Sequence, residues 1–281
     1  MTDDPIRPRA TDNAFLGELR GGSHEPTYSG ALSFMRRRFS RDIEDVDVVI
    51  WGVPFDSATS NRPGARFGPQ ALRRASAIFD GDPQFPSGLD PFDTLAVVDW
   101  GDCSFDYRHL DQVPGLIEAQ AVEILAAGAH LVTLGGDHSI TLPLLRAHAI
   151  QHGPLALVQF DAHQDTWDGG GGQSHGAFVT QAEAEGLIDT GRSIQIGIRT
   201  VAPDDFGIEI IDAYEARGLG AAGVAARGRE RGGGAPAHLS FDIDAPDPAL
   251  APGTRPPGSA ASRPRAVPPG SGADARHARP L

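Results

Sequence analysis

The sequence of 281 residues has one cysteine, no lysine and no apolar run long enough to cross a membrane. Cys103 cannot form an internal disulfide, which fits the reducing cytoplasm. The first residues are polar and acidic and lack the apolar segment of a secretion signal. The net charge of −13 argues against nucleic acid or an anionic membrane as the main partner. We therefore expect a cytoplasmic protein that acts on small molecules.

The composition, with 40% hydrophobic and 22% charged residues, is that of a globular protein. Short apolar runs rich in β-branched residues alternate with helical stretches, and nearly continuous apolarity indicates strands that are buried on both faces. The expected strands are Val46–Trp51, Leu95–Trp100, His130–Leu134, Leu155–Phe160, Ser193–Ile198 and His238–Ile243, with a weaker one at Phe206–Ile211. The expected helices include Gly68–Ala77, Val113–Ala127 and Ile140–Gln151, the first with Pro69 in its first turn. This alternation predicts an α/β fold with a mainly parallel sheet between layers of helices.

We expect three segments: an N-terminal arm over residues 1–30, a single domain over 31–254, and a tail over 255–281. The tail contains five arginines, six prolines, one acidic residue and no aromatic residue, which predicts disorder. Arginine, proline, alanine and glycine are the products of reading GC-rich DNA out of frame. The composition therefore suggests a frameshift near codon 255 that replaced the original C-terminus.

Chemically active side chains follow three of the expected strands, at the edge where parallel sheets bind their ligands. The sequences are GGDHS at 135–139, DAHQD at 161–165 and SFDID at 240–244. If the strands run on, alternate residues share a face, so that Asp161, His163 and Asp165 project together, as do Asp242 and Asp244. With His138, these residues supply four carboxylates and two imidazoles. One ion cannot use six protein ligands and keep a water, whereas two ions about 3.5–4 Å apart can. Oxygen-rich ligation without thiolate favours manganese, magnesium or iron over structural zinc.

These motifs, together with SHG at 174–176 and SFDIDAPDPALAPGT at 240–254, resemble those of the manganese ureohydrolases. The N-terminal half resembles the agmatinase branch in particular, through YSGALSFMR at 28–36 and GVPFDSATSNRPGARFGPQALRRAS at 52–76. Together, the similar segments span about residues 26–254. The resemblance implies a three-layer α/β/α sandwich with a largely parallel eight-stranded sheet, assembled as homotrimers or homohexamers. It also implies release of urea from a linear guanidino compound, first of all agmatine to putrescine, a step of polyamine biosynthesis.

The resemblance further implies two Mn²⁺ ions bridged by hydroxide. Two ligand sets follow from it: His138, Asp161, Asp165 and Asp242 for one ion, and Asp161, His163, Asp242 and Asp244 for the other, with Asp161 and Asp242 bridging. Asp165 would orient the nucleophile, and His175 would carry a proton to the leaving nitrogen. Asp168 and Ser174 lie in the loop before His175 and are weaker substrate-binding candidates.

Several alternatives remain open. Guanidinobutyrate, guanidinopropionate and proclavaminate-like substrates are close to agmatine, and formimidoylglutamate hydrolysis is possible on the same fold. In many relatives, an acidic residue after the position of Thr254 pairs with the guanidinium, and a final strand and helices follow. The segment after Thr254 lacks this acidic residue, and the strand and helices are missing or replaced. The chain could therefore be a metal-binding remnant with little activity. A related deacetylase would hold a single zinc ion. Among the remaining residues, we expect His109, His148, His152 and His277 at the surface and Cys103 in a structural role.

Overall fold

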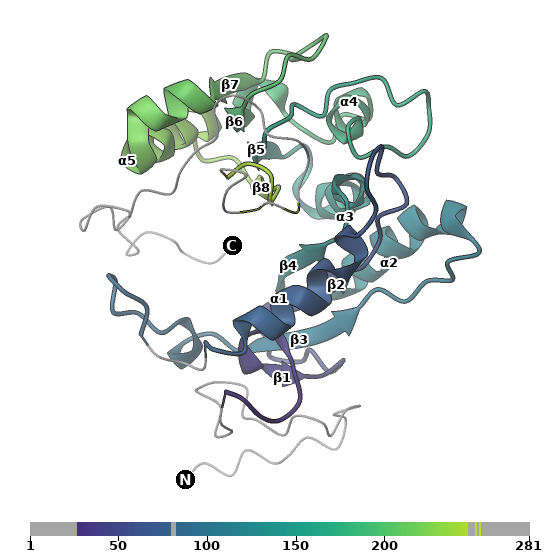
Figure 1. Cartoon of the computed structure of the whole chain (residues 1–281), viewed down its shortest axis with the longest axis vertical. Coiled ribbons are helices and arrows are strands. Elements are labelled where there is room, and N and C mark those ends of the chain that lie inside the picture. The colour runs from purple at the N-terminus through teal and green to yellow at the C-terminus, as the bar shows by residue number, and fades with distance from the viewer. Residues whose placement is uncertain (1–26, 80–82, 247–250, 252, 254–281) are drawn as a thin grey trace. The chain divides into compact units, whose positions relative to one another are not determined.

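The computed structural model describes residues 27–79, 83–246, 251 and 253 (Figure 1). The predictions made for the tail at 255–281 and for most of the N-terminal arm lie outside the described residues. The chain divides into two compact units, Met1–Ala147 and His148–Leu281. The expected single domain over 31–254 stays a prediction. No helix within the described residues combines the length and apolarity needed to cross a bilayer.

The first unit is built on a parallel sheet of four strands in the order β1-β3-β2-β4. The strands are β1 (Arg38–Phe39), β2 (Val48–Val53), β3 (Val97–Asp102) and β4 (His130–Gly135). Helix α2 (Val113–Ala126) and the start of α3 (Thr141–His152) pack through apolar side chains on one face of the sheet. The opposite face carries Phe34, Met35 and Phe92, and α1 (Gly68–Ser76) lies against β4. Apolar contacts on both faces explain why these strands read as continuous apolar runs.

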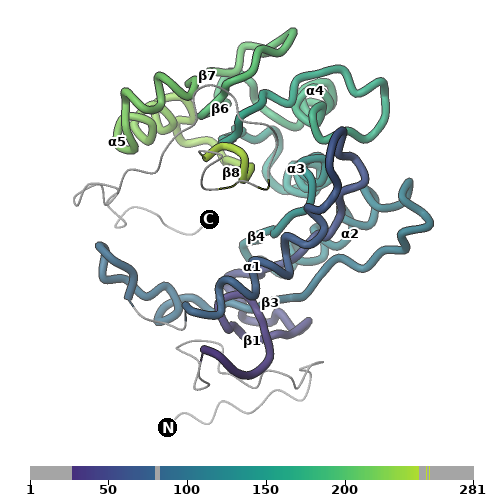
Figure 2. The backbone as a smooth tube through the Cα atoms, in the orientation of Figure 1, coloured from purple at the N-terminus to yellow at the C-terminus, as the bar shows by residue number. Residues whose placement is uncertain are grey.

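The second unit contains another parallel sheet, in the order β7-β6-β5-β8. Its strands are β5 (Ala156–Phe160), β6 (Ile194–Ile198), β7 (Glu209–Asp212) and β8 (Ala237–Phe241). Helix α5 (Ala213–Gly232) packs on one face against Val158, Ile194 and Ile196, and Figure 2 traces the backbone from β7 through this helix to β8. Helix α4 (Phe178–Ala184) buries Phe178 and Val179 completely.

The predicted α/β class, with parallel sheets and flanking helices, is confirmed. The described strands form two sheets of four, and each sheet belongs to one unit. Most strand boundaries lie within two residues of those expected, and Pro69 lies in the first turn of α1. The weaker seventh strand begins later than expected, at Glu209, and the sequence missed β1, α4 and α5. Helix α5 was missed because it is rich in glycine and arginine; Asp212 stabilises its start by accepting hydrogen bonds from the amides of Tyr214 and Glu215.

The turn after β4 requires glycine at position 136. Gly136 has φ +62°, and a Cβ atom there would lie 2.6 Å from the backbone oxygen of Phe55 and closer still to that of Val53. The turn leads directly into Asp137 and His138. The backbone of the GGDHS motif is therefore set by packing against the end of β2 and the loop that follows it.

We predict that Gly136→Ala lowers the free energy of unfolding by roughly 1–3 kcal/mol, because it combines backbone strain with a steric clash. Urea denaturation followed by circular dichroism measures this change. The matched variant is Gly115→Ala on α2, where a Cβ atom meets nothing within 4 Å. This variant should be neutral or slightly stabilising. Equal stabilities of the two variants would contradict the prediction.

Candidate metal centre

The ends of β5 and β8 bring two aspartates together. The two strands are parallel neighbours whose last residues, Phe160 and Phe241, pair in register. Asp161 and Asp242 follow directly, and the amide of Asp242 donates a hydrogen bond of 2.8 Å to the carbonyl oxygen of Phe160. Two carboxylates from segments eighty residues apart in the sequence therefore lie at the carboxyl edge of one sheet.

The chain turns immediately after each aspartate instead of continuing as a strand. The Oδ1 atom of Asp161 accepts a hydrogen bond of 2.8 Å from the amide of His163, and Asp242 does the same for the amide of Asp244, also at 2.8 Å. The expectation that alternate residues converge because the strands run on is wrong for both motifs. Short side chains that bond the backbone two residues ahead favour a turn over an extended strand. The same turn, used twice, aims the third residue of each motif back toward the first.

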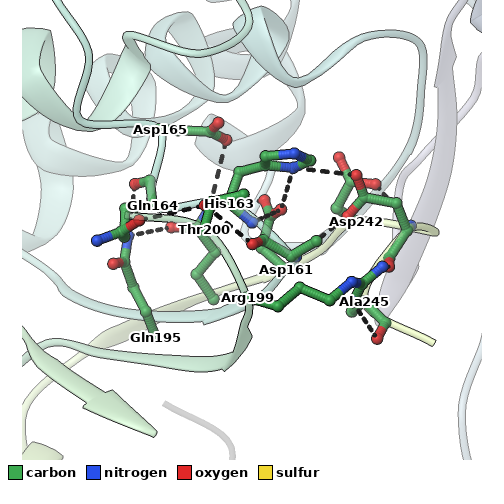
Figure 3. A network of polar contacts seen from close by, with 12 residues as sticks. Asp161, His163, Gln164, Asp165, Gln195, Arg199, Thr200, Asp242 and Ala245 are labelled. Atoms are coloured by element: carbon green, nitrogen blue, oxygen red, sulfur yellow. Dashed lines mark hydrogen bonds and ion pairs between the residues drawn. The ribbon is translucent and has the colours of Figure 1, made fainter. Parts of the chain in front are cut away.

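The turns bring Asp161, His163 and Asp244 into one cluster. Figure 3 shows the side chains of Asp161 and His163 close together. The Nδ1 atom of His163 lies 3.1 Å from Oδ2 of Asp244 and 3.5 Å from Oδ1 of Asp161. The other oxygen of Asp244 accepts a hydrogen bond of 3.1 Å from the amide of Ala162. One ligand-type atom from each of the three residues lies within 4.8 Å of the others.

The electrostatics of this cluster favour a bound cation. Asp161 and Asp244 are buried, with 1% and 6% of their surfaces exposed. Burial raises the pKa of Asp244, and the neighbouring carboxylates of Asp242 and Asp161 raise it further. Burial opposes protonation of His163, but hydrogen bonds to Asp161 and Asp244 outweigh it and raise its pKa to about 10. The carboxylates of Asp161 and Asp244, their neighbour Asp242 and the imidazole of His163 form a donor set without thiolate. Such a set suits a hard or borderline divalent ion.

Asp165 takes a left-handed backbone conformation with φ +54° and is buried. Its Oδ2 atom accepts a long hydrogen bond of 3.4 Å from Nε2 of Gln159, and its carbonyl oxygen accepts one from the amide of Val179. An aspartate tolerates this conformation better than most residues. The carboxylate is thus tied to the same buried glutamine that contacts Asp161.

Two buried glutamines support the carboxylates, and sequence reasoning missed both. Gln159 donates a hydrogen bond of 2.8 Å to Oδ2 of Asp161 and accepts one of 2.8 Å from Gln195, which also donates to the carbonyl oxygen of Gln164. Neither glutamine is exposed. The signal in the sequence was a glutamine within an otherwise apolar strand, in LALVQF and in SIQIGI. A buried amide needs hydrogen-bond partners, so a glutamine at such a position indicates a polar network.

Arg199 supports the second turn. Its guanidinium donates hydrogen bonds to the carbonyl oxygens of Asp244 and Ala245, the latter at 3.2 Å. Figure 3 shows this side chain beside the Asp242 turn. Arg199 directly follows the expected strand Ser193–Ile198. Its position indicates that it shapes the backbone that carries Asp244.

His138 belongs to the first unit, where it begins a short helical turn, His138–Ile140. Asp137 precedes it as the N-cap and accepts hydrogen bonds of 2.9 Å from the amides of Ser139 and Ala58. Burial raises the pKa of Asp137. The aspartate of the GGDHS motif therefore fixes the local backbone, and the role of His138 as a metal ligand stays a prediction.

The loop that carries His175 closes on itself beside Asp165. The amide of Trp167 donates a hydrogen bond of 3.1 Å to the carbonyl oxygen of Gly176, and a Cβ atom on Gly176 would lie 3.9 Å from Oδ1 of Asp165. Half-buried His175 is thus adjacent in sequence to Gly176, which lies near the Asp165 carboxylate. Asp168 and Ser174 bond to the amides of Gly170 and Gly176 in local turns. Their roles in substrate binding stay predictions.

Comparison with known proteins accounts for this arrangement. A model of the Arginase family matches residues 46–260. The chain belongs to the arginase family. It is 48% identical over 240 residues to the agmatinase of Chromobacterium violaceum, a match that covers 84% of this chain and 74% of that protein. The resemblance to the ureohydrolases, and to their agmatinase branch in particular, is therefore confirmed.

Solved structures of the arginase family agree. The crystal structure of a hypothetical agmatinase from Burkholderia thailandensis is 47% identical, with a TM-score of 0.85, and the match covers 88% of this chain and 79% of that one. The proclavaminate amidino hydrolase of Streptomyces clavuligerus is 39% identical, with a TM-score of 0.78 and coverage of 83% and 80%.

We predict that Gln159→Leu weakens Mn²⁺ binding about 10–100-fold, which is typical for loss of a group that holds a metal ligand in place. Leucine keeps a similar volume but removes the donor to Asp161. Titration of Mn²⁺ followed by electron paramagnetic resonance of the free ion measures the affinity. Gln181→Leu, on α4, is the matched control and should bind Mn²⁺ as the original chain does. Unchanged affinity in Gln159→Leu would contradict the positioning role.

Proposed function

We propose that this chain hydrolyses agmatine to putrescine and urea. It is a hydrolase that acts on the C–N bond of a linear amidine. The observation that carries the proposal is the 48% identity to an agmatinase over 84% of the chain. The family match over residues 46–260 includes every motif of the candidate centre. The 39% identity to the proclavaminate amidino hydrolase makes a proclavaminate-type substrate the second candidate.

The proposed cofactor is a pair of Mn²⁺ ions. Asp161, His163, Asp242 and Asp244 would hold one ion, and His138, Asp161, Asp165 and Asp242 the other. The clustered ligand atoms of Asp161, His163 and Asp244 support the first set. The second set rests on the sequence motifs. When bound, two such ions lower the pKa of a shared water, so that hydroxide is available near neutral pH.

The remaining steps fall to side chains of this chain. Asp165 is suited to accept a hydrogen bond from the attacking water and to hold its orientation. The water oxygen adds to the guanidinium carbon, and the bond from this carbon to the alkyl nitrogen then breaks. His175 would deliver the proton that lets this nitrogen leave as an amine, with urea as the other product.

A homotrimer or homohexamer and a cytoplasmic location complete the proposal. The oligomeric state follows from the resemblance, and the location follows from the sequence. Size-exclusion chromatography with light scattering measures the oligomeric state directly.

We predict urea release when the Mn²⁺-loaded chain is offered agmatine, with little from guanidinobutyrate, guanidinopropionate, proclavaminate or arginine. Asp161→Asn should abolish turnover, because it removes a charge shared by both proposed ions. Asp111→Asn, an exposed residue of the first unit, should leave the rate unchanged. Urea from another substrate alone would replace agmatine in the proposal. No urea from any substrate, with Mn²⁺ still bound, would favour a metal-binding remnant.

The same assay tests His175. His175→Ala should lower kcat about 10²–10⁴-fold, the usual contribution of a positioned general acid, while the Mn²⁺ content stays unchanged. His130→Ala, at an exposed position in β4, is the matched control. An unchanged kcat in His175→Ala would remove this residue from the mechanism.

A further inference from the structure

Three histidines of the second unit gather at a place remote from the metal centre. His148 and His152 lie one turn apart near the end of α3, with ring centroids 6.3 Å apart and ring planes at 23°. His238, the second residue of β8, packs its ring 5.6 Å from that of His148, at 67°. The sequence had placed His148 and His152 at the surface, where His152 is indeed exposed, but His148 is half-buried.

The position of His238 separates this cluster from the carboxylates. His238 precedes Asp242 by four residues, which in an extended strand is roughly 13 Å. It pairs in register with Leu157, whereas the neighbouring residue Val158 packs toward α5. His238 is therefore on the sheet face opposite α5, near the amino end of its strand, and the end of α3 contacts this face through His148.

One of the two ring spacings is close to that of imidazoles that share one metal ion. A histidine nitrogen lies about 2.0–2.1 Å from bound zinc, which puts the ring centre roughly 3.2 Å from the ion. Two rings on one tetrahedral ion are then about 5.2 Å apart. The rings of His148 and His238, 5.6 Å apart, are near this value, whereas those of His148 and His152, 6.3 Å apart, must approach each other to share an ion.

The sequence spacing also favours a shared ion. Residues four apart on a helix face the same side, and a pair of histidines at this spacing is a recurrent zinc-binding element. The third imidazole comes from a different element, so an ion here would join α3 to β8. The rings would need to rotate to converge, because the His148 and His152 planes are nearly parallel.

We propose that His148, His152 and His238 form a second metal site, selective for an imidazole-preferring divalent ion such as Zn²⁺. Three neutral imidazoles leave one position of a tetrahedral ion for water. The all-nitrogen donor set distinguishes this site from the oxygen-rich centre at the other end of β8. The ion would stabilise the native state by fastening the end of α3 to β8, since a ligand that binds only the folded chain shifts unfolding.

The test uses the full chain saturated with Mn²⁺ and dialysed against Zn²⁺, with bound zinc and released manganese measured by elemental analysis. The proposal predicts about one Zn²⁺ per chain bound in excess of any Mn²⁺ that is released. This equivalent should disappear in His152→Ala and in His238→Ala and should persist in His130→Ala. Zinc should also raise the Tm of the original chain and of His130→Ala, but not of the two cluster variants.

Two results would overturn the proposal: zinc uptake matched by an equal loss of manganese, or zinc uptake that is the same in His152→Ala and His238→Ala as in the original chain. His152 is exposed, so its replacement leaves the core intact and a loss of binding there cannot be assigned to misfolding. The readouts do not involve urea production, so the result is independent of the proposed agmatine hydrolysis.

Discussion

Buried negative charge at the ends of two neighbouring strands is the constraint on which the rest of the centre depends. Asp161 and Asp244 lie almost entirely out of water, and Asp242 stands beside them. Carboxylates in such a place cost several kcal/mol unless cations and hydrogen-bond donors surround them. In the structure, His163 contacts two of them and backbone amides satisfy other oxygens. A fold that maintains this arrangement is suited to hold divalent ions, and membership of the arginase family agrees with it.

The polar side chains behind the carboxylates make the arrangement specific. Gln195 bonds to Gln159, which bonds to Asp161 and, more weakly, to Asp165, so a chain of amides within the sheet fixes the orientation of two proposed ligands. Arg199 shapes the turn that carries Asp244 from its other side. Networks of this kind are costly when one member is missing, because each buried amide then loses a partner. Geometry at the centre is thus determined by side chains that are not among the proposed metal ligands.

Much of this could be predicted from the sequence, for identifiable reasons. Strands buried on both faces have a strong apolar signature, and carboxylates at their carboxyl ends indicate a site by topology alone. The turns after Asp161 and Asp242 were missed, because side-chain bonding to the backbone competes with strand extension over only two residues. The roles of Gln159 and Arg199, and the approach of His238 to His148, depend on strand register and helix packing. Hydrophobic periodicity encodes neither strand register nor helix packing. Helix α5 was missed for another reason, because its glycine-rich sequence gave no helical signal.

The central claim is that the carboxylates after β5 and β8 hold the catalytic ions. Crystals grown with Mn²⁺ and measured at the manganese absorption edge test this most directly. The account predicts two anomalous peaks, both within coordination distance of the Asp161 and Asp242 carboxylates. A single peak, or manganese located elsewhere with these carboxylates bonded only to protein groups, would contradict it.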